Sequence, residues 1–166
     1  MGWQCVIIPQ RGVFCRLTAA MRMRRLLSIS HSYVVAVNRR LAYELDRQGR
    51  GRWELTAVAP EYFHTYLRPV SYEFEPDLSY RMEILKLYLS HWVHVMVYDL
   101  RLRQILREPW DLVYVWEEPY TLVGAQAAFW SRADVPIVFR TYQNIIKRYP
   151  PPFSWIEAYC LRRCAA

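Results

Sequence analysis

The sequence predicts an α/β protein with a Rossmann-like, doubly wound sheet that is mainly parallel and carries helices on both faces. Short runs that are apolar throughout alternate with segments of helical spacing, and such strands are typical of a parallel sheet buried on both sides. The length of 166 residues suits one compact domain. Hydrophobic residues make up 54% of the chain and aromatic residues 16%. This composition excludes a disordered protein, which has too little apolar surface to offset chain entropy.

The first strand–helix–strand unit is expected before residue 60. Residues 24–30 (RRLLSIS) form the first short apolar run and predict a strand. Residues 38–48 have the spacing of an amphipathic helix, with Asn38 as its cap and Gly49 as a stop signal. Residues 53–59 (WELTAVA) predict a second, buried strand.

The middle of the chain has a weaker pattern. Residues 61–82 are rich in aromatic residues and prolines without a clear period, so we expect an irregular excursion over one end of the sheet. Residues 83–89 alternate between apolar and polar side chains, which predicts an extended strand. Residues 93–106 have helical spacing and predict the next helix.

The last third returns to a clear alternation of elements. Residues 111–116 (DLVYVW) predict a continuous apolar strand, and residues 120–132 an alanine-rich helix. Residues 135–140 (VPIVFR) predict another strand, and residues 153–163 one more helix. Two strands and two helices are therefore expected here.

The domain is expected to span residues 23–166, with residues 1–22 as a disordered leader or a start assigned too early. The net charge of +7 lies in the first third, where residues 1–52 carry ten arginines against two acidic residues. A solvated helix face explains this excess, and a patch that touches anionic lipid is the alternative. No aromatic interleaving marks a nucleic-acid groove, so no nucleic-acid partner is expected.

Cysteine spacing and hydropathy bear on the compartment. The four cysteines form no C-x-x-C pair and have no histidine at zinc-finger spacing, so neither a metal site nor a disulfide framework is indicated. Reduced thiols are typical of cytosolic proteins. No apolar run approaches the ~18 residues of a membrane span. We therefore expect a cytoplasmic protein, with peripheral attachment at the inner membrane face as an alternative.

Polar side chains follow several of the predicted strands. Ligands of an open parallel sheet collect beyond the carboxyl ends of its strands. The candidate binding residues there are His31, Tyr33, Glu117, Glu118, Tyr120, Tyr142, Gln143 and Asn144. Lys147 and Arg148 follow in the next loop, where they would attract a phosphate or an anionic acceptor or belong to a solvated loop.

Each of the strongest candidates has two interpretations. Glu117 and Glu118 would accept hydrogen bonds from sugar hydroxyls, or stabilise the N-terminus of the next helix through its dipole. An acid/base pair is disfavoured because neighbouring side chains of an extended segment point apart. His31 is either a structural residue or one that contacts a phosphate or catalyses. No residue is assigned as catalytic.

Several enzyme classes are excluded by missing motifs. The turn after the first strand reads SHSYVVAVNRR and contains no glycine. A side chain there blocks the close approach of a pyrophosphate to the backbone, which weighs against dinucleotide binding. The chain has no G-x-S-x-G elbow and no Walker motif either.

The order of these segments resembles the N-terminal domain of glycosyltransferase family 4. RRLLSISHSY and then PWDLVYVWEEPYTLVGAQAAFWSRADVPIVFRTYQNIIKRYPPPFSWIEAYCLRRC carry the resemblance, which covers about residue 23 onward and is strongest from Asp111. It implies a retaining GT-B enzyme, in which two Rossmann-like domains face each other across a cleft. The N-terminal domain of such enzymes mainly holds the acceptor, and the C-terminal domain binds the nucleotide sugar.

The resemblance also implies partners and site residues. A sugar or lipid-linked acceptor is expected, with no tightly bound cofactor and no metal ion. The donor domain is absent from this sequence, so the nucleotide sugar is expected only with that domain and the chain is expected to be inactive alone. By position, residues 31–33 match the loop near the donor phosphates and the acceptor, and Glu117, Glu118 and residues 142–144 match turns that face the cleft.

Two departures from the family pattern concern donor contacts. The glycines often found after the first strand are missing, and Gln143 and Asn144 stand where many relatives have a histidine. Two alternatives stay open beside the enzyme domain. One is a stand-alone partner that completes a separate donor domain in trans, and the other is a small flavodoxin-like nucleotide or regulatory domain.

Overall fold

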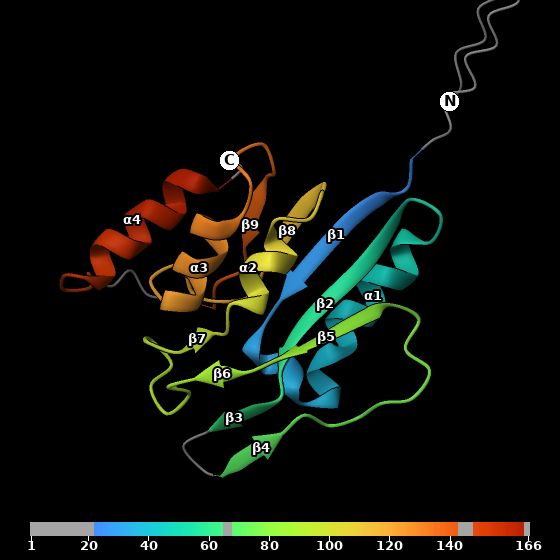
Figure 1. Ribbon diagram of the computed structural model, residues 1–166, viewed down its shortest axis with the longest axis horizontal. Coiled ribbons are helices and arrows are strands. Elements are labelled where there is room, and N and C mark those ends of the chain that lie inside the picture. The colour runs from blue at the N-terminus through green and yellow to red at the C-terminus, as the bar shows by residue number, and fades with distance from the viewer. Residues whose placement is uncertain (1–21, 65–67, 143–147, 165–166) are drawn as a thin grey trace, which may run out of the picture.

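The computed structural model describes residues 22–64, 68–142 and 148–164. At its centre lies a five-stranded sheet in the order β5-β2-β1-β8-β9, in which all neighbouring strands run parallel (Figure 1). The strands are β1 (Arg24–Ile29), β2 (Trp53–Pro60), β5 (Arg81–Leu85), β8 (Leu112–Val115) and β9 (Ile137–Phe139). The predicted Rossmann-like α/β fold is therefore confirmed.

Helices cover both faces of this sheet. On one face α1 (Arg40–Gly49) packs Ala42 against Leu26 of β1, and on the other α2 (Arg101–Leu106) and α3 (Leu122–Trp130) pack against Leu27. Adjacent strand residues thus enter opposite cores, as the continuously apolar runs predicted. The last helix, α4 (Phe153–Arg163), packs outside α3 (Figure 1).

Small elements extend beyond the sheet. Two 3-10 turns, η1 (His31–Val34) and η2 (Ala36–Arg39), connect β1 to α1. Two antiparallel pairs follow β2 and β5: β3 (Tyr62–His64) with β4 (Pro69–Ser71), and β6 (Leu87–Tyr88) with β7 (Val97–Tyr98). The expected excursion after the second strand therefore contains a small hairpin.

The helix predicted over residues 93–106 is wrong in its first half. It begins only at Arg101, because the chain before it forms β7 and pairs with β6. The amide side chain of Gln126 from α3 also fixes this segment. Its Oε1 accepts from the Tyr98 N–H at 2.9 Å, and its Nε2 donates to the Tyr98 carbonyl at 2.8 Å.

The predicted start of the first helix also needs correction. Asn38 is no cap, since it lies within η2 and its side-chain Nδ2 donates to the Ser32 carbonyl at 3.0 Å. Helix α1 begins at Arg40 without a side-chain cap and ends at Gly49, as expected. The leader expected over residues 1–22 lies outside the described residues except for Arg22, whose guanidinium is 3.5 Å from Asp111.

The strand order determines where a ligand would bind. From β1 the chain continues to β2 and β5 on one side, and from β8 to β9 on the other. Connections that leave neighbouring strands in opposite directions open a crevice beyond their carboxyl ends. In this fold the reversal falls between β1 and β8. In the described part of the chain, no helix is long and apolar enough to cross a membrane.

Candidate functional site

A crevice of about 200 Å³ lies at the carboxyl ends of β1, β8 and β9, where the strand order reverses. Four of the predicted site residues line it, namely His31, Glu117, Glu118 and Tyr142. The other lining residues are Ser32, Val93, Trp116, Thr121 and Arg140. The structure therefore brings the ends of three separate strands together, as the parallel-sheet rule predicted.

His31 and Glu117 form the floor of this crevice. The backbone N–H of His31 donates to Oε1 of Glu117 at 2.5 Å, and Nδ1 of the ring lies 2.7 Å from Oε2. The Glu117 side chain is only 1% exposed, while that of His31 is 22% exposed. Because an ionised carboxylate only accepts hydrogen bonds, Nδ1 carries the proton that faces Glu117, and Nε2 lies 3.5 Å from Oγ of Ser32, which also lines the crevice.

The Glu117 carboxylate controls the charge of His31. Burial of the imidazole lowers the pKa of His31, but the charge of Glu117 and its hydrogen bond raise this pKa by more, so the net shift from 6.5 is upward. The pair therefore favours an imidazolium ring. A protonated ring presents an N–H donor at Nε2, which suits a hydroxyl or phosphate oxygen.

Glu117 and Glu118 do not cap the helix that follows them. Thr121 is the N-cap of α3, and its Oγ1 accepts from the Gly124 N–H at 3.1 Å. The first turn of α3 contains no acidic residue. Neither carboxylate therefore caps α3 through a hydrogen bond, and stabilisation through the helix dipole stays a prediction.

Glu118 instead joins the ends of β8 and β9. Its Oε1 accepts from the Tyr142 N–H at 2.8 Å, and its Oε2 accepts from the Thr141 hydroxyl. Glu117 and Glu118 thus point to different partners, as expected for neighbours in an extended segment. Each carboxylate has a defined position before any ligand arrives.

An aromatic and cationic wall completes the crevice. The Arg140 Cζ lies 4.7 Å from the centroid of the Trp116 ring and 5.0 Å from that of Tyr142. The two ring centroids are 5.7 Å apart. Trp116 and Arg140 follow the paired residues Val115 and Phe139 of β8 and β9, so the register places them side by side.

Other predicted site residues lie elsewhere or outside the described residues. Tyr33 is fully buried, its hydroxyl is 2.8 Å from Oγ of Ser28, and burial raises its pKa well above 10. Tyr120 stacks on Tyr149 with ring centroids 4.0 Å apart, and Arg148 is exposed. None of these three predicted residues lines the crevice. Gln143, Asn144 and Lys147 lie outside the described residues.

Sequence reasoning missed Trp116 and Arg140. Both were assigned only to strands, as the last residues of the apolar runs DLVYVW and VPIVFR. A signal was present, because a large aromatic and a cation at the ends of two parallel strands face the ligand edge. Their proximity depends on β8 and β9 being neighbours, which the sequence alone does not state.

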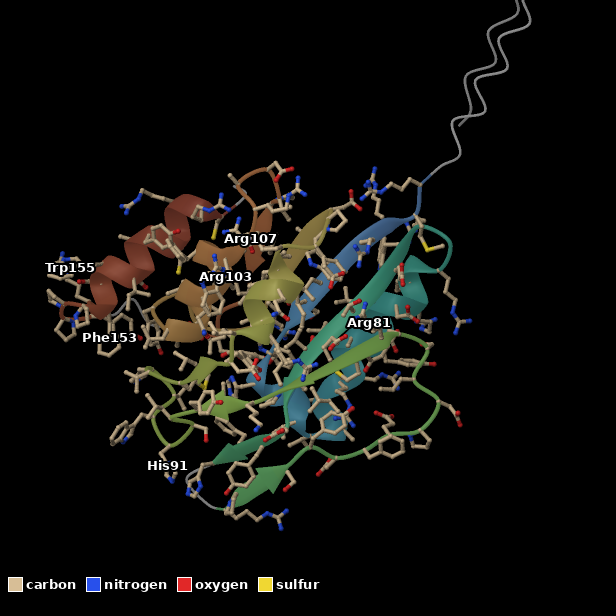
Figure 2. All side chains as sticks on the ribbon, in the orientation of Figure 1. Arg81, His91, Arg103, Arg107, Phe153 and Trp155 are labelled. Carbon is tan, nitrogen blue, oxygen red and sulfur yellow. The ribbon has the colours of Figure 1, made fainter. Side chains whose placement is uncertain are left out.

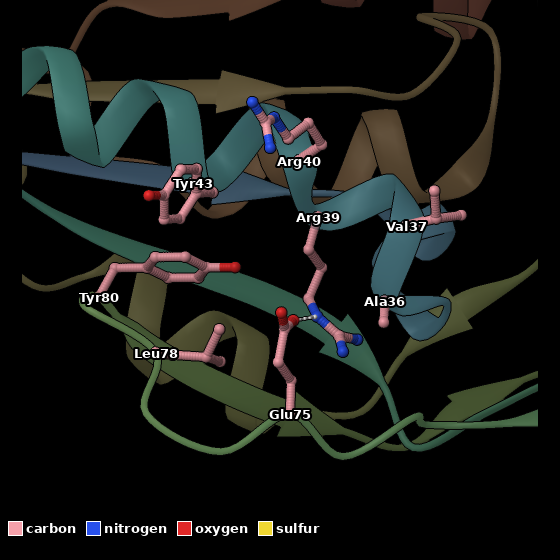
Figure 3. Close-up of a pocket in the computed structure, with 8 residues that line it drawn as sticks. All are labelled: Ala36, Val37, Arg39, Arg40, Tyr43, Glu75, Leu78 and Tyr80. Atoms are coloured by element: carbon pink, nitrogen blue, oxygen red, sulfur yellow. Dashed lines mark hydrogen bonds and ion pairs between the residues drawn. The ribbon is translucent and has the colours of Figure 1, made fainter.

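A second cavity of about 360 Å³ lies beside the start of α1 (Figure 3). Arg39, only 1% exposed, donates to the carbonyls of Tyr33 and Glu73 at 2.8 and 2.5 Å, and its Nε donates to Glu75 at 3.3 Å. These contacts tie the loop after β4 to η2, directly before α1. The Tyr80 hydroxyl beside it has no hydrogen-bond partner in the described structure. Because its charged group is already paired internally, this cavity is a structural junction.

Within residues 22–64, 68–142 and 148–164, no cluster of three or more His, Cys, Asp and Glu side chains is arranged to hold a metal ion. Comparison of the chain with protein-family models, curated proteins and solved structures found no match.

Proposed function

We propose that this chain is the acceptor-side, Rossmann-like domain of a retaining, nucleotide-sugar-dependent glycosyltransferase of the GT-B kind. In this proposal a sugar-containing acceptor binds in the crevice between β1 and β8. The donor sugar would be held by a second Rossmann-like domain that faces this edge, within one protein or in trans. The order of the sequence segments supports the proposal through its resemblance to glycosyltransferase family 4.

The observation that carries the proposal is the buried His31–Glu117 pair at the point where the strand order reverses. The pair fixes the His31 imidazole, whose Nε2 lies 3.5 Å from Oγ of Ser32 and which is able to donate to a ligand oxygen when the ring is protonated. Glu118 adds carboxylate oxygens, which accept hydrogen bonds from hydroxyl groups. Sugars offer both kinds of partner, because each hydroxyl donates one hydrogen bond and accepts others.

The aromatic wall of the crevice suits the apolar faces of a sugar ring. The faces of a pyranose ring carry C–H groups, which pack on aromatic rings, and Trp116 and Tyr142 provide such rings beside the polar floor. Convergent polar groups next to an apolar wall are typical of small-molecule sites. A nucleotide pyrophosphate is less suited to the turn after β1, because this turn contains no glycine.

The proposal is tested by saturation-transfer NMR with a panel of neutral mono- and disaccharides and with UDP as the competing ligand. We expect transfer from the protein to at least one saccharide, and a loss of this transfer in Trp116→Ala. Trp155→Ala is the matched control, because Trp155 is 69% exposed on α4 and does not line the crevice. Binding of UDP without binding of any saccharide would instead favour the flavodoxin-like nucleotide domain.

A further inference from the structure

Among the described residues, Arg140 is the one arginine or lysine that lines the crevice, and its position is fixed without a carboxylate. Its guanidinium Cζ lies 4.7 Å from the centroid of the Trp116 ring and 5.0 Å from that of the Tyr142 ring. Stacking uses the flat face of a guanidinium, whereas its N–H donors lie in the plane. Contact with the two rings therefore positions the group without engaging it in an ion pair.

The acidic residues nearby are already engaged. Glu117 is paired with His31, and Glu118 accepts from Thr141 and Tyr142. Neither forms an ion pair with Arg140, and no other ion pair of Arg140 occurs among the described residues. Arg140 is half-buried, so its charge is partly removed from water without a counter-ion, which is unfavourable until an anion binds.

The chemistry of the Arg140 guanidinium indicates the class of ligand that it binds. A guanidinium held in a plane presents a fork of N–H donors that matches two oxygens of a phosphate. The aromatic rings that orient the fork are also the wall on which a sugar ring would pack, so one ligand with a sugar and a phosphate satisfies both.

We propose that Arg140 binds a phosphate group of the ligand, so that the crevice takes a phosphorylated sugar. The phosphate is a monoester of a soluble sugar or a diester of a lipid headgroup, and Arg140 recognises the oxygens that both share. The sugar part of this statement rests on the proposed function, whereas the phosphate part rests on Arg140 alone. This assignment places the phosphate on Arg140 and not on the loop of Lys147 and Arg148.

The test measures binding to the whole chain by NMR, with the ¹⁵N–¹H signal of the Trp116 indole as the reporter. The probes are inorganic phosphate, glucose, glucose 6-phosphate, and phosphatidylcholine vesicles with or without phosphatidylglycerol. We expect inorganic phosphate to shift the Trp116 signal, and glucose 6-phosphate to bind about tenfold more tightly than glucose, as one charge-assisted hydrogen bond would give. A response to vesicles only when they contain phosphatidylglycerol would identify a lipid as the source of the phosphate.

Three variants make the test specific. Arg140→Gln should abolish the preference for phosphate, and Arg140→Lys should keep part of it because the charge remains without the fork. Arg107→Gln is the control, since Arg107 is exposed just after α2, before β8 begins, and forms no ion pair in the described structure (Figure 2). Melting curves show whether each variant folds, and Arg140→Lys carries the test if Arg140→Gln does not.

The outcomes separate this inference from the proposed function. Glucose binding without any preference for phosphate would overturn the role of Arg140 and leave the sugar site standing. Phosphate binding that depends on Arg140, with no saccharide bound, would overturn the sugar site and support the role of Arg140. An equal loss of phosphate binding in Arg140→Gln and Arg107→Gln, or no phosphate binding at all, would overturn the inference.

Discussion

Nδ1 of His31 lies 2.7 Å from Oε2 of Glu117, although these residues are 86 positions apart in the sequence. The contact joins the loop after β1 to the loop after β8, which are neighbouring strands in the sheet. Glu117 is almost fully buried, so its charge is balanced by the imidazole and the backbone N–H of His31. The shape and the charge of the crevice floor therefore depend on this pair.

Replacing Glu117 by glutamine should lower the pKa of His31. Burial by itself lowers this pKa, and the charge and hydrogen bond of Glu117 are what raise it above 6.5. An NMR titration of the imidazole signals measures the change. In Glu118→Gln the pKa of His31 should stay raised, because Glu118 bonds to Thr141 and Tyr142 instead. Equal values in the two variants would contradict the account.

The stability that His31 contributes should fall as the pH rises. Its folded pKa is above the unfolded value of 6.5, so the folded state binds the proton more tightly. The contribution is complete below pH 6.5 and is lost as the pH rises through the folded pKa. Urea unfolding of the wild type and of His31→Gln should show the largest difference in unfolding free energy just below pH 6.5. If the difference in unfolding free energy grew toward alkaline pH instead, the raised pKa of His31 would be contradicted.

Arg39→Met should destabilise the fold by about 2–4 kcal/mol. The change leaves the buried Tyr33 carbonyl and the partly buried Glu73 carbonyl without their donors, and an unsatisfied buried group costs about 1–3 kcal/mol. Arg40→Met is the matched control. Arg40 is 75% exposed, pairs with Glu44 on the surface and lies 5.5 Å from the centroid of the Tyr43 ring, so its loss should cost less than about 0.5 kcal/mol. Similar unfolding midpoints in urea for the two variants would refute the structural role of Arg39.

Gly124→Ala should lower the stability by about 1–3 kcal/mol. A Cβ at this position would lie 2.9 Å from the Glu118 carbonyl oxygen and 3.3 Å from the Phe139 ring. The carbonyl belongs to the backbone beside the crevice and cannot move without disturbing it. Helix propensity alone would give the opposite sign, since alanine is favoured over glycine by about 1 kcal/mol. A higher melting temperature would therefore contradict the close approach of α3 to this loop.

The sheet was predictable because its strands are buried on both faces. Residues 112–116 (LVYVW) contain no charged side chain, and such continuous apolar runs are typical of a central parallel strand. The first half of the predicted helix over residues 93–106 failed for a nonlocal reason. Tyr98 is held by the Gln126 side chain and by pairing with β6, and neither contact appears in the local periodicity.

The site was predictable only to the level of strand ends. Polar residues after parallel strands share one edge, which brought His31, Glu117 and Glu118 to the crevice. Their pairing depends on β1 being next to β8, and the meeting of Trp116 with Arg140 depends on the register of β8 and β9. Strand order and register come from the packing of the whole chain, so no local pattern contains them.

The central claim is that a saccharide binds at the carboxyl ends of β1, β8 and β9. The most direct measurement is a map of backbone amide shifts while the chain is titrated with a saccharide that shows saturation transfer. The account predicts the largest shifts at His31, Ser32, Thr121 and Tyr142, which line the crevice. Shifts confined to the cavity around Arg39, with those four amides unchanged, would contradict it.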